Sequence, residues 1–206
     1  MSTPTLSRTA RIATASAMTI ALGGGLIACG GNEKPAPDVN VSSTATTQAK
    51  QAAQALQRSK PTGLRIPSAG VDSKSMIDLD TDANGELQVP NPDTEANKPG
   101  WWTGGVTPGE KGVSVVVAHY DTAHGPALMK DLKKIKLGDT IEVPRADGST
   151  AKFKIREIQD VNKKDFPTNK VYGQTDRPEL RLLTCGGPIK DGHRTNNIIY
   201  FADLVN

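Results

Sequence analysis

From Thr62 to the C-terminus, short apolar segments alternate with turns rich in Gly, Pro, Asp and Asn, and this pattern constrains the fold most. Segments such as 114–118 (SVVVA) and 197–205 (NIIYFADLV) are rich in β-branched and aromatic residues, which favour strands. Between segments 139–143 and 151–158, an Asp-Gly pair is a strong hairpin signal. About eight such strands with almost no helix predict an all-β domain, either a closed barrel or a sandwich.

The first 29 residues have a different character. Arg8 and Arg11 precede an almost uncharged apolar stretch, 12–28, that leads into the sequence LIACG. A positive segment followed by an apolar one is typical of an export signal, and its end resembles the bacterial lipoprotein signal. The resemblance implies cleavage before Cys29, which would then carry acyl chains. An uncleaved anchor helix, at the short limit for a membrane span, and an ordinary cleaved signal are the alternatives. All three place the remaining chain outside the cytoplasm, attached to the membrane in the first two.

Residues 30–61 contain few large apolar side chains and many Ser, Thr, Ala, Gln and Pro residues, which predicts a flexible linker or stalk. Within it, 48–59 consists of good helix formers. The whole chain carries a net charge of +3, and removal of 1–29 with its two arginines leaves +1. Because no basic run is interleaved with aromatic residues, a nucleic-acid partner is not expected.

The chain has only two cysteines, Cys29 and Cys185. If Cys29 is lipidated, Cys185 has no disulfide partner, which is unusual in an exported protein. Cys185 ends the apolar segment 180–184 and precedes two glycines. Such a position suits an accessible nucleophile, and it also suits a small buried side chain.

His119 ends the apolar segment 114–118 as Cys185 ends its own segment. If these two strands are neighbours with a shared direction, the two side chains meet at one rim, where a thiolate–imidazolium pair could attack a carbonyl group. Arg194 could donate forked hydrogen bonds to the resulting oxyanion or to the substrate backbone. Asp121 could orient His119 or simply form a turn. The three histidines and the distant cysteine lack zinc-site spacing, so no metal is expected.

The order of these groups resembles that of the sortases, which are exported cysteine transpeptidases built on an eight-stranded β-barrel. Residues 181–185 (RLLTC) are similar to the family motif Thr-Leu-x-Thr-Cys, with Arg181 in place of the first Thr, and Ala118 stands where Gly usually precedes the histidine. The surrounding sequence is most similar to actinobacterial class E and F sortases in five segments: Ile66-Pro67, Gly100-Trp101, 108–112 (PGEKG), 115–122 (VVVAHYDT) and 175–187 (TDRPELRLLTCGG).

This resemblance implies a closed eight-stranded barrel with one or two short helices, formed by a catalytic domain at 62–206. It implies that Cys185 attacks the Thr–Gly carbonyl of an LPXTG-like sorting signal, that Arg194 holds the oxyanion and that His119 protonates the leaving amine. Thr184 would support the site, and the loops around 160–178 would shape the groove. An amine acceptor, such as a peptidoglycan precursor or another protein, would resolve the thioester without a metal or organic cofactor.

Two other functions stay open at this point. One is a lipid-anchored, non-catalytic binding protein on the same barrel, against which the complete set of His119, Cys185 and Arg194 speaks. The other is a hydrolytic cysteine peptidase, a thiol protease that forms the same acyl-enzyme and resolves it with water.

Overall fold

The computed structural model describes residues 42–43 and 53–206. The predicted signal or anchor at 1–29, Cys29 included, lies outside the described residues, as does most of the linker predicted at 30–61. Among the described residues, no helix is both long and apolar enough to cross a membrane.

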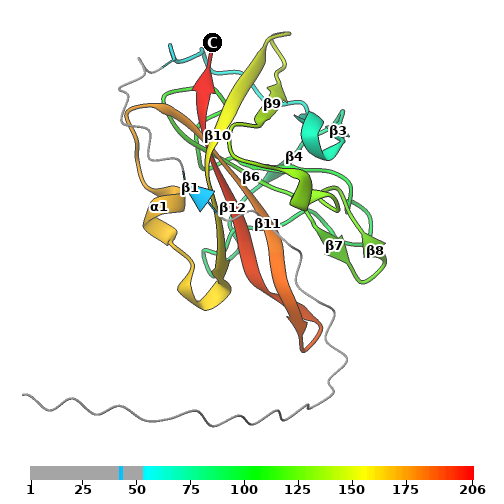
Figure 1. Cartoon of the computed structure of the whole chain (residues 1–206). Coiled ribbons are helices and arrows are strands. Elements are labelled where there is room, and N and C mark those ends of the chain that lie inside the picture. The colour runs from blue at the N-terminus through cyan, green and yellow to red at the C-terminus, as the bar shows by residue number, and fades with distance from the viewer. Residues whose placement is uncertain (1–41, 44–52) are drawn as a thin grey trace, which may run out of the picture. The chain divides into compact units, whose positions relative to one another are not determined.

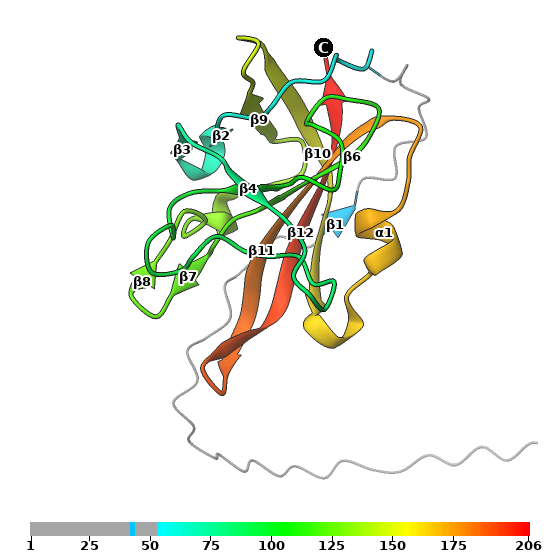
Figure 2. The ribbon, with the colours of Figure 1, turned by 180° about the vertical axis from the view of Figure 1, so that it is seen from behind.

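One curled sheet contains most of the described strands. Its hydrogen-bonded order is β3-β2-β9-β10-β12-β11-β6-β5-β4, and β1 adds to β10 from outside this path. The strands are β1 (Ser42–Ser43), β2 (Leu64–Ile66), β3 (Val71–Ser73), β4 (Ile77–Leu79), β5 (Gly100–Trp102), β6 (Gly112–Val117), β9 (Thr140–Pro144), β10 (Thr150–Asn162), β11 (Pro178–Lys190) and β12 (His193–Val205). The long strands β10, β12 and β11 run side by side at its centre (Figures 1 and 2).

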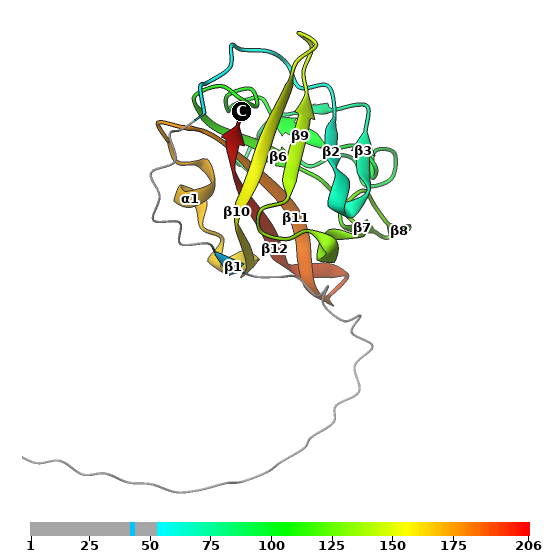
Figure 3. The same cartoon turned by 45° about the horizontal axis from the view of Figure 1, so that its top comes forward.

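Short elements fill the connections between these strands. A separate two-stranded ribbon pairs β7 (Asp121–Thr122) with β8 (Gly125–Pro126). Three single turns of 3-10 helix are η1 (Pro67–Ala69), η2 (Leu132–Lys134) and η3 (Lys163–Asp165), and the one α-helix of the described residues is α1 (Thr168–Tyr172). In Figure 3, α1 lies on one side of the central strands, and β2 and β3 lie on the other.

The central strands are buried on both faces because side chains alternate between two apolar clusters. On β12, Ile198 and Tyr200 belong to the larger cluster, inside the curled sheet, whereas Ile199 and Phe201 belong to a second cluster. The second cluster also contains Val171 of α1, so the short helix covers the outer face of the sheet. The connection from β10 to β11 contains η3 and α1, so this connection forms the layer that covers the outer face of the sheet.

The predicted all-β class is confirmed, but the strand count is larger than eight. The path has nine strands, and its end strands β3 and β4 have no ladder to each other among the described residues. Strand β3, too short for a clear alternating pattern, was not predicted. Residues 86–89 form no strand and contribute one isolated bridge, Thr81 to Leu87, across a turn in which the N–H of Asp82 donates to the carbonyl of Glu86 at 2.8 Å.

The end of the predicted linker packs on the barrel instead of forming a helix. Residues 53–60 have no regular structure, although 48–59 is rich in helix formers. The backbone N–H of Leu56 donates to the carbonyl of Gly109 at 2.8 Å, and the N–H of Ser59 donates to Thr107 Oγ1 at 3.1 Å. Buried Arg145 also donates to the carbonyl of Gln57. These tertiary hydrogen bonds replace the local ones of a helix, whose mostly alanine face would bury little.

Candidate active site

The site is built on two neighbouring parallel strands, β6 and β11. Their register pairs Val117 with Leu183, and the N–H of Ala118 donates to the carbonyl of Leu183 at 3.0 Å. His119 and Cys185 each lie two residues beyond that last pair, His119 just past the end of β6 and Cys185 within β11, which continues along β12 to Lys190 instead of ending at the thiol as the sequence suggested. The condition on which the sequence argument rested, that the two strands are neighbours with a common direction, is therefore met, and both side chains line one pocket.

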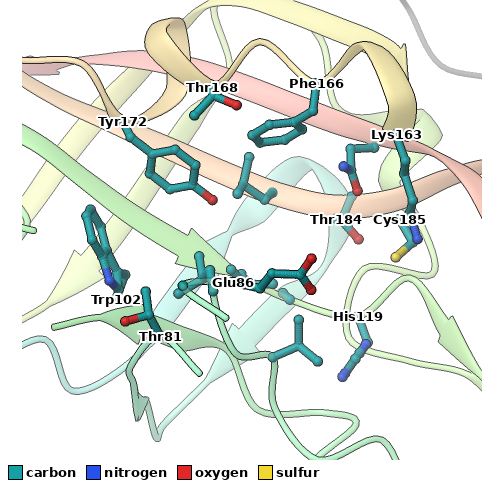
Figure 4. A pocket seen from close by; sticks show the side chains of 17 residues that line it. Thr81, Glu86, Trp102, His119, Lys163, Phe166, Thr168, Tyr172, Thr184 and Cys185 are labelled. Carbon is teal, nitrogen blue, oxygen red and sulfur yellow. The ribbon is translucent and has the colours of Figure 1, made fainter. Parts of the chain in front are cut away.

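A pocket of about 750 Å³ opens at this rim, and both His119 and Cys185 line it (Figure 4). Its walls come from three regions: the ends of β6 and β11, the connection from β4 to β5, and the segment η3–α1. The last region contributes Lys163, Phe166 and Tyr172, in agreement with the expectation that loops around 160–178 shape the groove. Thus the nucleophile candidate lines an open groove, where a peptide can reach it.

Cys185 is partly exposed and is the only free cysteine among the described residues. The two glycines after it let β11 and β12 approach closely. A Cβ atom at Gly186 would lie 2.5 Å from Cδ1 of Ile198, and Gly187 adopts a φ of 71°, which favours glycine. The Gly-Gly pair therefore permits close packing on β12 and leads into the register shift between Gly186 and Ile189, directly after the thiol.

His119 has a defined hydrogen-bond partner in the connection from β4 to β5. Its Nε2 lies 2.6 Å from the carbonyl oxygen of Pro90. A carbonyl oxygen only accepts, so Nε2 carries the proton and Nδ1 is the nitrogen that remains for proton exchange. Asp121 does not orient this ring by a hydrogen bond, because its carboxylate is engaged elsewhere.

Arg194 and Asp121 form a partly buried, bidentate ion pair. Nε and Nη2 of Arg194 donate to the two carboxylate oxygens at 2.9 and 2.7 Å, and Nη1 donates to the carbonyl of Gly187 at 2.6 Å. The guanidinium also lies 4.6 Å from the ring centre of Tyr120. The hydrogen bonds to Asp121 raise the pKa of Arg194, and Cys185 adds a smaller electrostatic contribution in the same direction. Arg194 is thus a fixed cation beside the site, although it does not line the pocket itself.

Thr184 lines the pocket beside Cys185. Its hydroxyl oxygen is buried and has no hydrogen-bond partner among the described residues. A buried hydroxyl without a partner is costly, so this strand position carries a local energetic penalty next to Cys185.

Sequence reasoning did not identify the connection from β4 to β5 as part of the site. This connection places Thr81, Glu86, Leu87 and Val89 on the pocket wall, and Trp102 of β5 joins them. Val89 is 54% exposed, the one large apolar side chain among the described residues that is exposed. The one indication of this connection in the sequence was the turn-rich segment 81–85 (TDANG). Such a segment predicts a bend in the chain but not the surface against which the bend packs.

Arg181, the departure from the family motif, does not line the pocket. It is buried, donates to Glu179 Oε2 at 2.6 Å and to the carbonyl of Lys170 at 3.3 Å, and lies over the ring of Phe201. This residue therefore ties α1 to β11. The described residues contain no cluster of His, Cys, Asp and Glu arranged to hold a metal ion.

Residues 64–205 match the family model described as "Sortase domain". Solved structures similar to this chain include a sortase D5 transpeptidase from Clostridium perfringens (19% identity, TM-score 0.51, 71% of this chain and 79% of that chain). A lid mutant of sortase A from Corynebacterium diphtheriae is similar at 18% identity and TM-score 0.53, over 73% of each chain. Sortase C1 from Streptococcus agalactiae is similar at 18% identity and TM-score 0.53, over 70% of this chain and 67% of that chain. No curated protein matches the chain.

Proposed function

The chain belongs to the sortase family, and from this premise we propose that it is an exported, membrane-attached transpeptidase. In this proposal the enzyme, of the actinobacterial class E or F type, cleaves an LPXTG-like sorting signal and transfers the product to an amine acceptor. The acceptor is a cell-wall precursor or another protein. The observation that supports the proposal most strongly is the equivalent placement of His119 and Cys185, each two residues beyond the last β6–β11 pair, in one pocket.

The chemistry begins with the Cys185 thiolate, which attacks the carbonyl carbon of the scissile Thr–Gly bond and forms a tetrahedral oxyanion. His119 as imidazolium then donates a proton to the leaving amine, and the C–N bond breaks to leave a thioester on Cys185. The amine acceptor attacks this thioester, loses a proton to His119 and releases the thiolate. Each step uses only groups of the chain, the peptide and the acceptor.

Arg194 stabilises the oxyanion or holds the backbone of the signal in this mechanism. A guanidinium has five N–H donors, and three of them are engaged by Asp121 and Gly187. The other two have no acceptor among the described residues, so they remain for a ligand. Because Asp121 holds the plane of the guanidinium, the positive charge is oriented before the substrate arrives.

Attachment to the outer face of the membrane through a lipidated Cys29, or through an anchor helix at 1–29, is part of the same proposal. The linker at 30–61 joins that attachment to the catalytic domain at 62–206. Docking of residues 53–60 on the barrel shortens the part of the linker that can span the distance to the membrane.

One assay tests the proposed reaction against its alternatives. The full chain is incubated with LPXTG and LAXTG peptides, with and without an amine acceptor, and Cys185→Ala is the matched control. Transpeptidation predicts a peptide–acceptor conjugate that depends on Cys185. Product formed only with water identifies a hydrolytic peptidase, and absence of turnover with every signal peptide, together with a silent Cys185→Ala substitution in the cell, identifies a binding protein.

A further inference from the structure

The pocket has two chemically different ends. At one end, the rings of Trp102 and Tyr172 meet edge to face with centres 5.4 Å apart, and Phe166 lies beside Tyr172. At the other end are Cys185 and His119 (Figure 4). A peptide with an apolar anchor residue against the rings and its scissile carbonyl at the thiol must therefore run along the groove between them.

Glu86 lies between these two ends and points into the pocket (Figure 4). Its backbone is fixed, because its N–H donates to Asp82 Oδ1 at 2.9 Å and its carbonyl accepts from the N–H of Asp82 at 2.8 Å. The bridge from Thr81 to Leu87 closes the same turn. The carboxylate is solvent-exposed and makes no hydrogen bond or ion pair with the described residues, so the turn presents a hydrated negative charge to the groove.

An unpaired carboxylate is unfavourable in a site that needs a thiolate, since like charges near each other disfavour ionisation. The other charged side chain of the pocket wall is Lys163 of η3, which makes no ion pair with Glu86. A ligand that brings its own cation to Glu86 removes the unfavourable interaction while the thiolate reacts. The carboxylate therefore favours a cationic ligand over a neutral or anionic one.

We propose that Glu86 selects a basic side chain at the variable position of the sorting signal, the residue just before the threonine whose carbonyl Cys185 attacks. This inference rests on the proposed function. Three side chains of the signal lie between the apolar anchor and the scissile bond, and of these only the variable one can carry a charge, because the other two are proline or alanine and threonine. Lysine or arginine at this position reaches the carboxylate across the groove.

The test compares peptides of the form LPXTG and LAXTG with Lys, Gln or Glu at the variable position, on the full chain, by kcat/KM for thioester formation. Partly exposed ion pairs have modest energies, so we expect Lys to exceed Glu by about threefold to tenfold at low ionic strength. The preference should shrink in 0.5 M salt, where the screening length is about 4 Å. Glu86→Gln should remove the preference, and Glu86→Lys should reverse it.

Two further variants locate the effect. Asp72→Asn removes the same charge from β3, outside the residues that line the pocket, and should keep the preference for Lys. Lys163→Gln removes the positive charge on the opposite pocket wall and should increase the preference for Lys peptides. Turnover of all peptides with equal efficiency, or a preference that Glu86→Gln leaves intact, overturns the inference while the proposed reaction stands. No turnover with any peptide overturns the proposed function and this inference together.

Discussion

The imidazole Nε2 of His119 lies 2.6 Å from the carbonyl oxygen of Pro90, so the connection from β4 to β5 holds the ring of the proposed general acid. His119→Gln keeps an amide N–H near the Nε2 position but removes the group that transfers protons. We expect this variant to lose about 10²–10⁴-fold in thioester formation, the usual range for general acid–base catalysis. Single-turnover labelling of Cys185 by a signal peptide measures the loss.

The matched control for this substitution is His119→Ala, which removes both functions. If the contact with Pro90 stabilises the connection, His119→Ala should melt at a lower temperature than His119→Gln. Equal melting temperatures would show that the contact positions the ring without supporting the loop. Near-normal rates in His119→Gln would remove His119 from the chemistry.

Arg194→Lys tests the forked geometry of the buried cation. Lysine keeps the charge but offers no rigid pair of donors, so it cannot bind both oxygens of Asp121 in one plane and also face a ligand. We expect kcat/KM for signal peptides to fall by about 10²–10³-fold, as for removal of an oxyanion donor. Steady-state kinetics with a folding check by circular dichroism measures the effect.

Asp121→Asn tests whether Arg194 needs both carboxylate oxygens of Asp121 to keep its orientation. The amide keeps one acceptor oxygen for Arg194 but can no longer form the bidentate pair. We therefore expect kcat to fall by about tenfold, which is less than the loss expected for Arg194→Lys. Wild-type kinetics in Asp121→Asn would contradict a role for the pair in orienting the guanidinium. A loss equal to that of Arg194→Lys would show that the two residues act as one unit.

Acid stability should depend on Glu179, which is buried among Arg156, Arg177 and Arg181. Burial alone would raise the pKa of this carboxyl, but the adjacent guanidinium groups lower it from 4.5 to about 2. A lowered folded-state pKa contributes stability that is fully present above pH 4.5 and is lost as the pH falls towards 2. The shift corresponds to about 3 kcal/mol of unfolding free energy.

Urea denaturation at pH 7, 4, 3 and 2 measures this dependence. Wild-type stability should fall steeply below pH 4.5, and Glu179→Gln should be less stable at pH 7 but show a flatter decline. An equally steep decline in Glu179→Gln would assign the acid sensitivity to other carboxylates.

Membrane attachment is tested by metabolic labelling with a radioactive fatty acid. If the end of the signal acts as a lipoprotein signal, label in the membrane fraction should depend on Cys29 and vanish in Cys29→Ala. Cys185→Ala is the matched control and should retain the label. Label that persists in Cys29→Ala would refute lipidation at this residue and favour the anchor helix.

The meeting of His119 and Cys185 could be anticipated from the sequence on the condition that their strands are parallel neighbours, because their equal spacing on the two strands then needs little tertiary information. His119 and Cys185 each end an apolar segment, and in parallel neighbours such ends meet. The apolar strands at 114–118 and 197–205 were predictable for the same reason, since burial on both faces leaves continuous apolar runs. The hairpin from β9 to β10 followed from its Asp-Gly turn.

The opposite wall of the pocket was not predictable, because polar connections take their shape from distant partners. Glu86 reaches the groove through a turn whose position depends on the contact between Pro90 and His119, 29 residues apart. Helix α1 is five residues long and has no capping side chain, so its sequence carries little helical signal. Its position depends on Val171 in the outer cluster and on the hydrogen bond from Arg181.

Arg181 replaces a threonine of the family motif, and its contacts predict an effect on the groove wall and not on the nucleophile. The side chain lies on the same face of β11 as Leu183 and Cys185, four residues before the thiol, beneath α1. It connects Glu179 with the carbonyl of Lys170, and α1 places Tyr172 on the pocket wall. Loss of Arg181 should therefore loosen the aromatic end of the groove.

Arg181→Met keeps the length and apolar stem of the side chain but removes both polar contacts. We expect a several-fold higher KM for signal peptides with a nearly unchanged kcat, because binding at the aromatic end weakens while the thiol and imidazole stay in place. Destabilisation should stay near 1–3 kcal/mol, since Arg156 and Arg177 still pair with Glu179. Tyr172→Leu should raise KM in the same way, and the two changes should not add if Arg181 acts through α1. A tenfold fall in kcat with unchanged KM would place the influence of Arg181 at Cys185 instead.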